Sequence, residues 1–176
     1  MIIGKNCKIS DKISVYNDDI TIGDNVRIDD WCLLSGHISI GSHIHIAVGN
    51  YFYGGSGIVL GDFSQFGPKS TYLSESDDFF GESLVGPCAP MKYKPKYSRG
   101  QIIIGRHGLI GAHCVVLPGV AIREGASIGA CSLVRDDCNP WSIYAGVPAR
   151  FIRAREKKML EYEKQFLEEY HGGRSA

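Results

Sequence analysis

The chain has no excess charge of either sign, because its 176 residues include 19 Lys and Arg and 19 Asp and Glu. A neutral chain has no global attraction for nucleic acid or for an anionic membrane surface, so a partner has to be sought in local features. No run of about 18 apolar residues is present, and the opening MIIGKNCKIS lacks the basic and apolar regions of a secretory signal. We therefore expect a cytoplasmic protein with no nucleic-acid partner and no membrane insertion.

The six cysteines contain no CxxC spacing of the kind that marks zinc or redox sites. Several of them fall at positions of a sequence repeat, described next, where a small residue packs inward. We therefore expect reduced packing residues in place of disulfides, and no metal site. The cysteines are Cys7, Cys32, Cys88, Cys114, Cys131 and Cys138.

The chain does have a repeat of six residues. An aliphatic or aromatic residue begins each hexad, and the fifth place usually holds a small or aliphatic residue. Hexads begin at Ile3, Ile9 and Val15, at Ile22, Ile28, Leu34, Ile40, Ile46 and Phe52, and at Ile104, Ile110, Val116, Ile122, Ile128 and Val134. A period of six fits neither an α-helix nor plain strand alternation. It predicts short strands joined by turns, three to a coil, in stacked coils that bury the first-place column.

Two segments depart from the repeat. Between Tyr72 and Ile104 the hexads stop, and a loop of this length is usually functional, so we expect an ordered loop that packs against a neighbour. After Pro148 the apolar spacing becomes helical. We therefore predict one β domain over residues 1–150 with an inserted loop at about 73–101, followed by a helix over residues 151–171 that caps the coils.

Several motifs resemble those of the hexapeptide-repeat acetyltransferases. They are IGDNV, IGSHIHI, IVLGDFS, SESDDFFGES, VVLPGVAI, IGACSLV and IYAGVPARFIRAR, and the resemblance covers about residues 1–155. It implies a mainly β fold, a single-stranded left-handed parallel β-helix, that assembles as a homotrimer with its sites between subunits. The left hand is implied by the resemblance alone, since parallel crossovers are otherwise right-handed.

The same resemblance implies an acetyl-CoA-dependent enzyme in which the acceptor attacks the thioester directly. The SDDF motif is similar to that of exopolysaccharide and O-antigen O-acetyltransferases, and the maltose and galactoside enzymes are more distant. In those two branches a His-Pro pair provides the catalytic histidine where this chain has Ser76 followed by Asp77. The main expectation is therefore acetylation of a sugar hydroxyl on a polysaccharide or its precursor, by a base from elsewhere in the chain.

Acyl transfer needs a general base, and a neutral imidazole suits that task near pH 7. His45 is the sixth residue of its hexad and leads into a polar and aromatic segment, so we predict that it is the base. Asp77 or Asp78 would orient it across a subunit boundary, because an unshifted carboxylate alone is too weak a base. Four other histidines occupy the fourth place of a hexad, where we expect surface turns: His37, His43, His107 and His113.

The acceptor and the acyl donor are each assigned a set of residues. For a carbohydrate or sugar-nucleotide acceptor the predicted contacts are Asn50, Tyr51, Tyr53, Ser76 and Glu82. Late hexads without bulky outward groups predict a groove for the pantetheine arm of acetyl-CoA, and late arginines predict phosphate contacts. These donor residues are Gly111, Ala112, Ala130, Val134, Arg135, Arg150 and Arg153, and Arg135 takes the place of a lysine in the family motif.

Three alternatives remain open on the same sequence. An N-acetyltransferase of an amino-sugar nucleotide would need the same scaffold and the same base. A γ-type carbonic anhydrase shares the fold and binds zinc through histidines, although the spacing of His107 and His113, six residues, does not match its zinc-binding pair. A β-helix without catalytic activity could act as an assembly scaffold.

Overall fold

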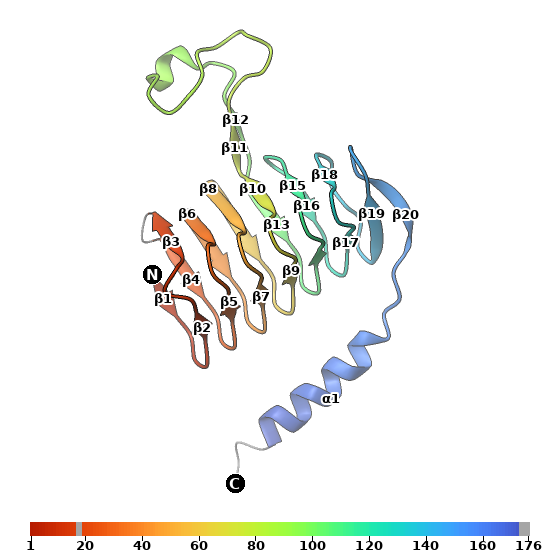
Figure 1. The fold of residues 1–176 in the computed structure, drawn as a ribbon. Coiled ribbons are helices and arrows are strands. Elements are labelled where there is room, and N and C mark those ends of the chain that lie inside the picture. Colours follow the sequence, from red (N-terminus) through yellow and green to blue (C-terminus); the bar gives the residue numbers. More distant parts are fainter. Residues whose placement is uncertain (17–18, 173–176) are drawn as a thin grey trace.

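A computed structural model describes residues 1–16 and 19–172. Short parallel strands wind in left-handed coils that stack along one axis, which gives the prism seen in Figure 1. Each coil offers its hydrogen-bonding edge to the next, as the parallel registers Ile28↔Ile46 and Ile110↔Ile128 illustrate. The predicted left-handed parallel β-helix is confirmed, and the hexads are its strands.

The strands form three faces. The first face contains β1 (Ile2–Ile3), β4 (Ile20–Ile22), β13 (Ile102–Ile104) and β16 (Ala121–Ile122). The second contains β2 (Lys8–Ile9), β5 (Arg27–Ile28), β7 (His45–Ile46), β9 (Gln65–Phe66), β14 (Leu109–Ile110), β17 (Ser127–Ile128), β19 (Ser142–Ala145) and β20 (Arg150–Ala154). The third contains β3 (Ser14–Tyr16), β10 (Thr71–Leu73), β15 (Val115–Val116) and β18 (Leu133–Val134). Two longer strands, β6 (Leu33–Ile40) and β8 (Tyr51–Leu60), turn the corner from the third face to the first.

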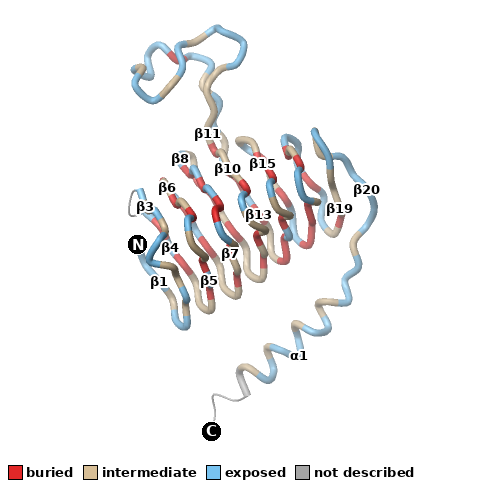
Figure 2. Tube along the Cα trace, in the orientation of Figure 1, coloured by how far each residue is buried: buried red, intermediate tan, exposed pale blue. Residues whose placement is uncertain are grey.

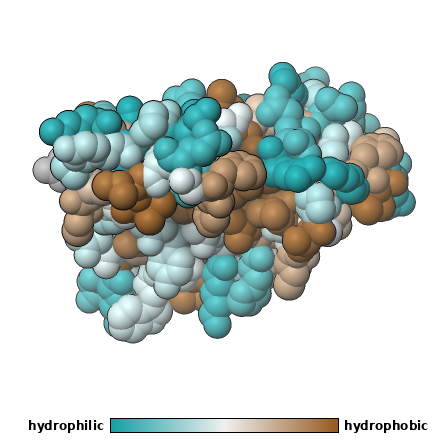
Figure 3. Space-filling view, turned by 90° about the horizontal axis from the view of Figure 1, so that it is seen from above, coloured by the Kyte–Doolittle hydropathy of each residue, from teal (hydrophilic) through white to brown (hydrophobic). Residues whose placement is uncertain are grey.

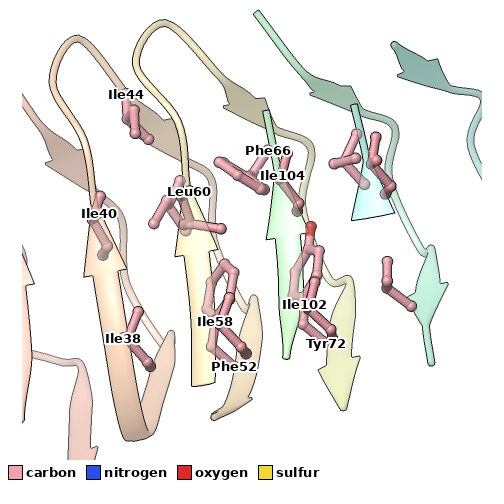
Figure 4. Close-up of a cluster of buried hydrophobic side chains, with 14 of the residues drawn as sticks. Ile38, Ile40, Ile44, Phe52, Ile58, Leu60, Phe66, Tyr72, Ile102 and Ile104 are labelled. Atoms are coloured by element: carbon pink, nitrogen blue, oxygen red, sulfur yellow. The ribbon is translucent and has the colours of Figure 1, made fainter. Parts of the chain in front are cut away.

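Burial follows the six-residue repeat (Figure 2). The first-place residues from Ile22 to Phe52 and from Ile104 to Val134 are all buried, and they form the column whose middle part is drawn in Figure 4. In that column the rings of Phe52 and Tyr72 stack with centroids 4.4 Å apart. Cysteines fill several inward positions, among them the buried Cys114, and all six are free thiols. The repeat therefore specifies the core and explains the buried cysteines, whereas Cys88 in the loop and Cys131 are exposed.

The inserted loop leaves the coil stack without interrupting its hydrogen bonds. Tyr72, before the loop, pairs with Val116 after it, and Leu60 pairs with Ile104 in the same way. The two ends of the loop pair as the antiparallel strands β11 (Glu75–Ser76) and β12 (Ser98–Arg99), and the loop contains one 3₁₀ turn, η1 (Met91–Tyr93). The loop thus projects from the corner between the third and first faces (Figure 1).

The C-terminal segment differs from the prediction at its start. Residues 150–154 form β20, which pairs antiparallel with β19, and the helix α1 spans Met159–Gly172. The reason is that β19 would leave an open strand edge at the last coil, and β20 covers it. The prediction of a helix from residue 151 is therefore wrong, because residues 150–154 form the strand that covers this edge and the helix begins only at Met159.

The helix α1 lies along a side of the prism and does not cap its end. Glu163 accepts a hydrogen bond from Arg106 and one from His107, at 2.9 Å for the latter, and Tyr170 donates to Asn25 at 3.2 Å. These partners all lie at the corner between the first and second faces, Arg106 and His107 in the turn after β13 and Asn25 in the turn after β4. No helix among residues 1–16 and 19–172 combines the length and apolar character that a membrane crossing requires.

Three of the four fourth-place histidines occupy the turns that the repeat predicts, whereas His37 lies within strand β6. His43, His107 and His113 have φ angles of 60°, 58° and 57°, in the left-handed region used by tight turns. The expectation of surface exposure is wrong for His107, whose side chain is only 7% exposed. Its ring is covered by α1 and contacts Phe63 and Trp141.

Candidate functional site

The ribbon of β11 and β12 has two chemically different sides. Its register pairs Ser76 with Ser98 and Glu75 with Arg99. Because side chains alternate along a strand, the serines face one side and the charged pair faces the other. A pocket lies on each side of the ribbon.

The serine side of the ribbon borders a cleft of about 570 Å³. One wall comes from the loop, and the other comes from the turns after β15 and β18. The lining residues are Ser76, Asp77, Asp78, Phe79, Phe80, Glu82, Lys96, Ser98, Leu117, Pro118 and Arg135. The cleft therefore brings together five residues that the sequence assigned to the site: Ser76, Asp77, Asp78, Glu82 and Arg135.

The two aspartates of the cleft are hydrogen-bonded to their own loop. Asp77 accepts from the backbone N–H of Gly86 at 2.9 Å and from Lys94 Nζ at 3.0 Å, and these bonds lower the pKa of Asp77. Asp78 accepts from the backbone N–H groups of Phe80 and Glu82, at 2.8 and 2.6 Å. A carboxylate that is stabilised in its charged form is a weaker base. In this chain both aspartates accept hydrogen bonds that hold the backbone of the loop in place.

His45 lies on β7 in the second face, outside the cleft. Its Nε2 atom is 2.8 Å from Asp29 Oδ2, and Asp29 also accepts from Arg27 Nε at 2.7 Å. Partial burial opposes the charge of Asp29, but the hydrogen bonds from His45 and Arg27 outweigh it, so the pKa of Asp29 is lowered. Among the residues that line the cleft there is no histidine. Within one subunit His45 therefore pairs with Asp29, and it contacts neither Asp77 nor Asp78.

The pocket on the other side of the ribbon, about 250 Å³, is lined by Ser35, Tyr53, Gly55, Leu73, Glu75 and Tyr97. Glu75 accepts from Tyr97 Oη at 3.1 Å and from Ser56 Oγ at 2.8 Å. Burial and the nearby carboxylate of Glu75 raise the pKa of Tyr97. Of the predicted acceptor residues, Tyr53 reaches this pocket.

Two other predicted acceptor contacts lie elsewhere. The side chain of Asn50 is completely buried and donates to the carbonyls of Ala47 and Gly67 at 2.7 and 3.0 Å, so it is not open to a substrate. This corrects the prediction for Asn50, whose amide satisfies backbone carbonyls at an inward corner. Tyr51 is exposed on β8 of the third face, outside both pockets.

The residues predicted to bind the acyl donor are small or aliphatic residues of the coils and, described in the next paragraph, three arginines. Gly111, Ala112 and Ala130 follow β14 and β17 at the corner between the second and third faces, and a Cβ on Gly111 would lie 2.5 Å from the backbone nitrogen of Ala130. Close stacking of adjacent coils therefore requires that glycine, whatever it binds. The prediction for Val134 is corrected, because its side chain is buried in the core, as is usual for a first-place residue.

The predicted arginines lie on the last coils. Arg135 and Arg150 both bond to Asp136 Oδ2, at 3.4 and 3.2 Å, so one carboxylate holds the two guanidinium groups close together. Arg153 is exposed on β20. The two arginines and Asp136 together carry one net positive charge, and Arg135 of this group lines the cleft, where a cation suits a phosphate group.

The described part of the chain contains no candidate metal site. Within residues 1–16 and 19–170, no three His, Cys, Asp or Glu side chains are grouped so that they could hold a metal ion. His107 bonds to Glu163 and packs under α1, and His113 lies in an exposed turn of the next hexad.

No family model matches the chain, but several known proteins are similar to it over most of its length. The dTDP-4-amino-4,6-dideoxy-D-glucose acyltransferase of Escherichia coli is 40% identical over 168 residues, which cover 93% of this chain and 87% of that enzyme. The galactoside O-acetyltransferase of Escherichia coli K12 is 34% identical over 141 residues, 76% of this chain and 63% of that enzyme.

A solved structure is similar over nearly the whole length. AntD, an N-acyltransferase from Bacillus cereus, is 45% identical with a TM-score of 0.93, and the match covers 95% of this chain and 90% of that chain. That structure is of a variant in complex with dTDP-4-amino-4,6-dideoxyglucose and coenzyme A, and another AntD structure contains dTDP and 3-hydroxybutyryl-CoA.

The coil stack, the loop-walled cleft and these relatives together define a CoA-dependent acyltransferase. The chain belongs to the hexapeptide-repeat acyltransferase family. With that membership the carbonic anhydrase and the scaffold without catalytic activity are set aside.

Proposed function

We propose that this enzyme transfers an acyl group from acyl-CoA to the amino group of a dTDP-linked 4-amino-4,6-dideoxy sugar. The observation that carries the proposal is the similarity, over nearly the whole chain, to two enzymes whose names or bound ligands include that sugar nucleotide. The O-acetyltransferase relative matches a smaller share of both chains. The amino-sugar alternative therefore replaces acetylation of a polysaccharide hydroxyl as our preferred function.

The charge distribution of the cleft supports an amine acceptor. Its loop wall carries the carboxylates of Asp77, Asp78 and Glu82 and one cation, Lys96, which pairs with Glu82 at 3.5 Å, and its coil wall carries Arg135. Carboxylates on the loop side suit a cationic amino sugar, and a cation on the coil side suits the phosphates of coenzyme A. Ser76 and Ser98 add neutral hydroxyl groups that can bond to sugar hydroxyls.

The proposed reaction is a direct transfer. The amine nitrogen, once deprotonated, attacks the thioester carbonyl, an amide bond forms, and the carbon–sulfur bond breaks. A base takes the proton that the amine loses on attack and returns it to the leaving sulfur, so coenzyme A leaves as its thiol. We propose His45 as that base, with Asp29 holding its ring, because it is a partly exposed histidine with a carboxylate partner at 2.8 Å.

His45 can serve a cleft only across a boundary between copies, since one chain places it on another face. We therefore propose the homotrimer that the sequence implies. Its support in the structure is the loop, where Phe79 and Phe80 are 89% and 91% exposed. Apolar side chains are also exposed among polar ones on the face seen from above (Figure 3). Exposed aromatic residues of this kind are typical of surfaces that another protein covers.

A pair of acceptors tests the function. The purified protein is mixed with acetyl-CoA and either dTDP-4-amino-4,6-dideoxyglucose or the matched dTDP-6-deoxyglucose, which has a hydroxyl in place of the amine. We expect thiol release and a product one acetyl group heavier with the amino sugar alone, and the product should resist mild alkali as an amide does. Alkali-labile product from the hydroxyl compound, without turnover of the amino sugar, would restore O-acetylation.

A further inference from the structure

The inserted loop has little apolar core of its own. Phe79, Phe80, Leu84 and Val85 are all exposed, so burial of apolar side chains does not order the segment between them. One charged side chain in the loop is buried instead, that of Lys94, which is only 3% exposed. Lysine is almost never buried to this degree without partners.

Lys94 has three partners that come from different parts of the loop. Its Nζ atom donates to Asp77 Oδ1 at 3.0 Å and to the carbonyl oxygen of Gly86, and it lies 5.1 Å above the ring of Tyr97. The backbone N–H of Gly86 donates to the other oxygen of Asp77 at 2.9 Å. Gly86 adopts a φ of +84°, a conformation that favours glycine. In this conformation its N–H donates to Asp77 and its carbonyl oxygen accepts from Lys94.

The contacts continue from the loop to the coils. Tyr97 donates to Glu75, and Glu75 accepts from Ser56 of β8. We call this continuous set the polar spine: Ser56, Glu75, Tyr97, Lys94, Asp77 and Gly86. It connects the far part of the loop to the coil stack through hydrogen bonds and one cation–π contact.

We infer that Lys94 is a positioning residue for the acceptor, holding the loop wall of the cleft through Asp77. Asp77 lies between Ser76 and Asp78, and all three line the cleft. An anchor at Asp77 therefore fixes the direction of its two neighbours. The inference rests on the proposed function only in assigning the loop wall to the acceptor.

Removal of the lysine alone has a distinct consequence. Lys94→Met leaves the partly buried Asp77 without its cation and frees the carbonyl of Gly86, so the loop wall loses its fixed shape. In the double variant Lys94→Met/Asp77→Asn no unpaired charge remains. The two substitutions are therefore expected to be coupled, with the double variant less impaired than the sum of the single variants.

The kinetic test compares Lys94→Met with Lys92→Met, an exposed lysine of the same loop that does not line the cleft. We expect Lys94→Met to raise the acceptor KM by about tenfold or more and the KM for acetyl-CoA by less than about twofold, with little effect of Lys92→Met. The acceptor is whichever of the two sugar nucleotides the wild type acylates. A failure of the amine assignment thus leaves this test intact.

A second readout needs no substrate. Hydrogen exchange at the amide of Gly86 should become faster in Lys94→Met and stay at the wild-type rate in Lys92→Met. Faster exchange with an unchanged acceptor KM would reduce Lys94 to a structural role and overturn the inference, as would equal effects on both KM values. If Lys94→Met does not fold, the double variant is compared with Asp77→Asn, because Asp77 itself lines the cleft and its loss alone can change the acceptor KM.

Discussion

The coils and the inserted loop are stabilised by opposite means. In the coils, every first-place residue from Ile104 to Val134 is buried, and each strand bonds to its neighbours in parallel register. In the loop, the large apolar residues are exposed and the ordering contacts are polar, centred on Lys94. The coils therefore provide a rigid frame whose energy comes from many equivalent contacts, whereas the loop depends on a few specific ones. Changes in the two regions should accordingly affect different measurements.

The largest expected effect tests whether the coils supply chemistry as well as rigidity. His45→Gln should lower kcat by about 10²- to 10⁴-fold, because it removes the proposed base, and thermal unfolding should stay unchanged because the side chain is partly exposed. The matched control is His113→Gln, an exposed histidine of a coil turn. Wild-type turnover in His45→Gln would remove His45 from the mechanism.

The next prediction compares burial in the two regions. Phe52→Ala should cost about 3–5 kcal/mol of unfolding free energy, because a fully buried ring stacked on Tyr72 leaves a cavity. Leu84→Ala, in the exposed part of the loop, should change stability by no more than about 0.5 kcal/mol. Denaturant unfolding measures both. Similar losses in the two variants would mean that the loop packs on a core after all.

A smaller effect is expected where loop and coils meet. Arg135→Ala should raise the KM for acetyl-CoA by about tenfold, because a cation is lost beside the cleft. The same variant assayed with acetyl-dephospho-CoA should match the wild type if the lost contact is to the terminal phosphate. Arg123→Ala is the control, since this equally exposed arginine pairs with Asp137 outside the cleft. Equal losses with both donors would contradict the phosphate role.

The smallest effect is a pH dependence of the helix contact. Burial, and then the charge of Arg106, lower the pKa of His107 from its ordinary 6.5, so the unfolded chain binds this proton more readily than the folded protein does. The contribution of His107 to stability is therefore complete above pH 6.5 and is lost as pH falls toward the lowered value. We expect His107→Asn to flatten the decline in unfolding free energy on acidification, measured in urea at several pH values. The exposed His113→Asn should keep the wild-type slope.

The hexad repeat predicted the core almost residue by residue, and it also contradicts two of the predicted site residues. Asn50 stands in a fifth place and Val134 in a first place. The repeat therefore predicted that both side chains face the interior, and assigning them to ligands contradicted it. Arg27 and His45 are 18 residues apart, one coil, so the partners of His45 could also have been sought one coil earlier, where Asp29 lies.

Other features depend on contacts that no repeat encodes. His107 looks like any fourth-place turn residue, and it is buried because α1 returns along that corner and brings Glu163 to it. Lys94 lies in a segment without periodicity, so nothing in its sequence neighbourhood distinguishes it from Lys92 or Lys96. Its burial follows from Asp77 and Gly86, which are 17 and 8 residues away. Side chains that meet through tertiary folding of an aperiodic loop are beyond pattern analysis.

The pairing of Tyr72 with Val116 beneath the loop has an evolutionary consequence. Because the ladder closes below the loop, an ancestor could have lengthened, shortened or exchanged this segment without disturbing a single coil. If the loop wall binds the acceptor as proposed, the acceptor could change in this way while the coils stay the same, and grafting the loop of a relative onto these coils would transfer the sugar specificity of that relative.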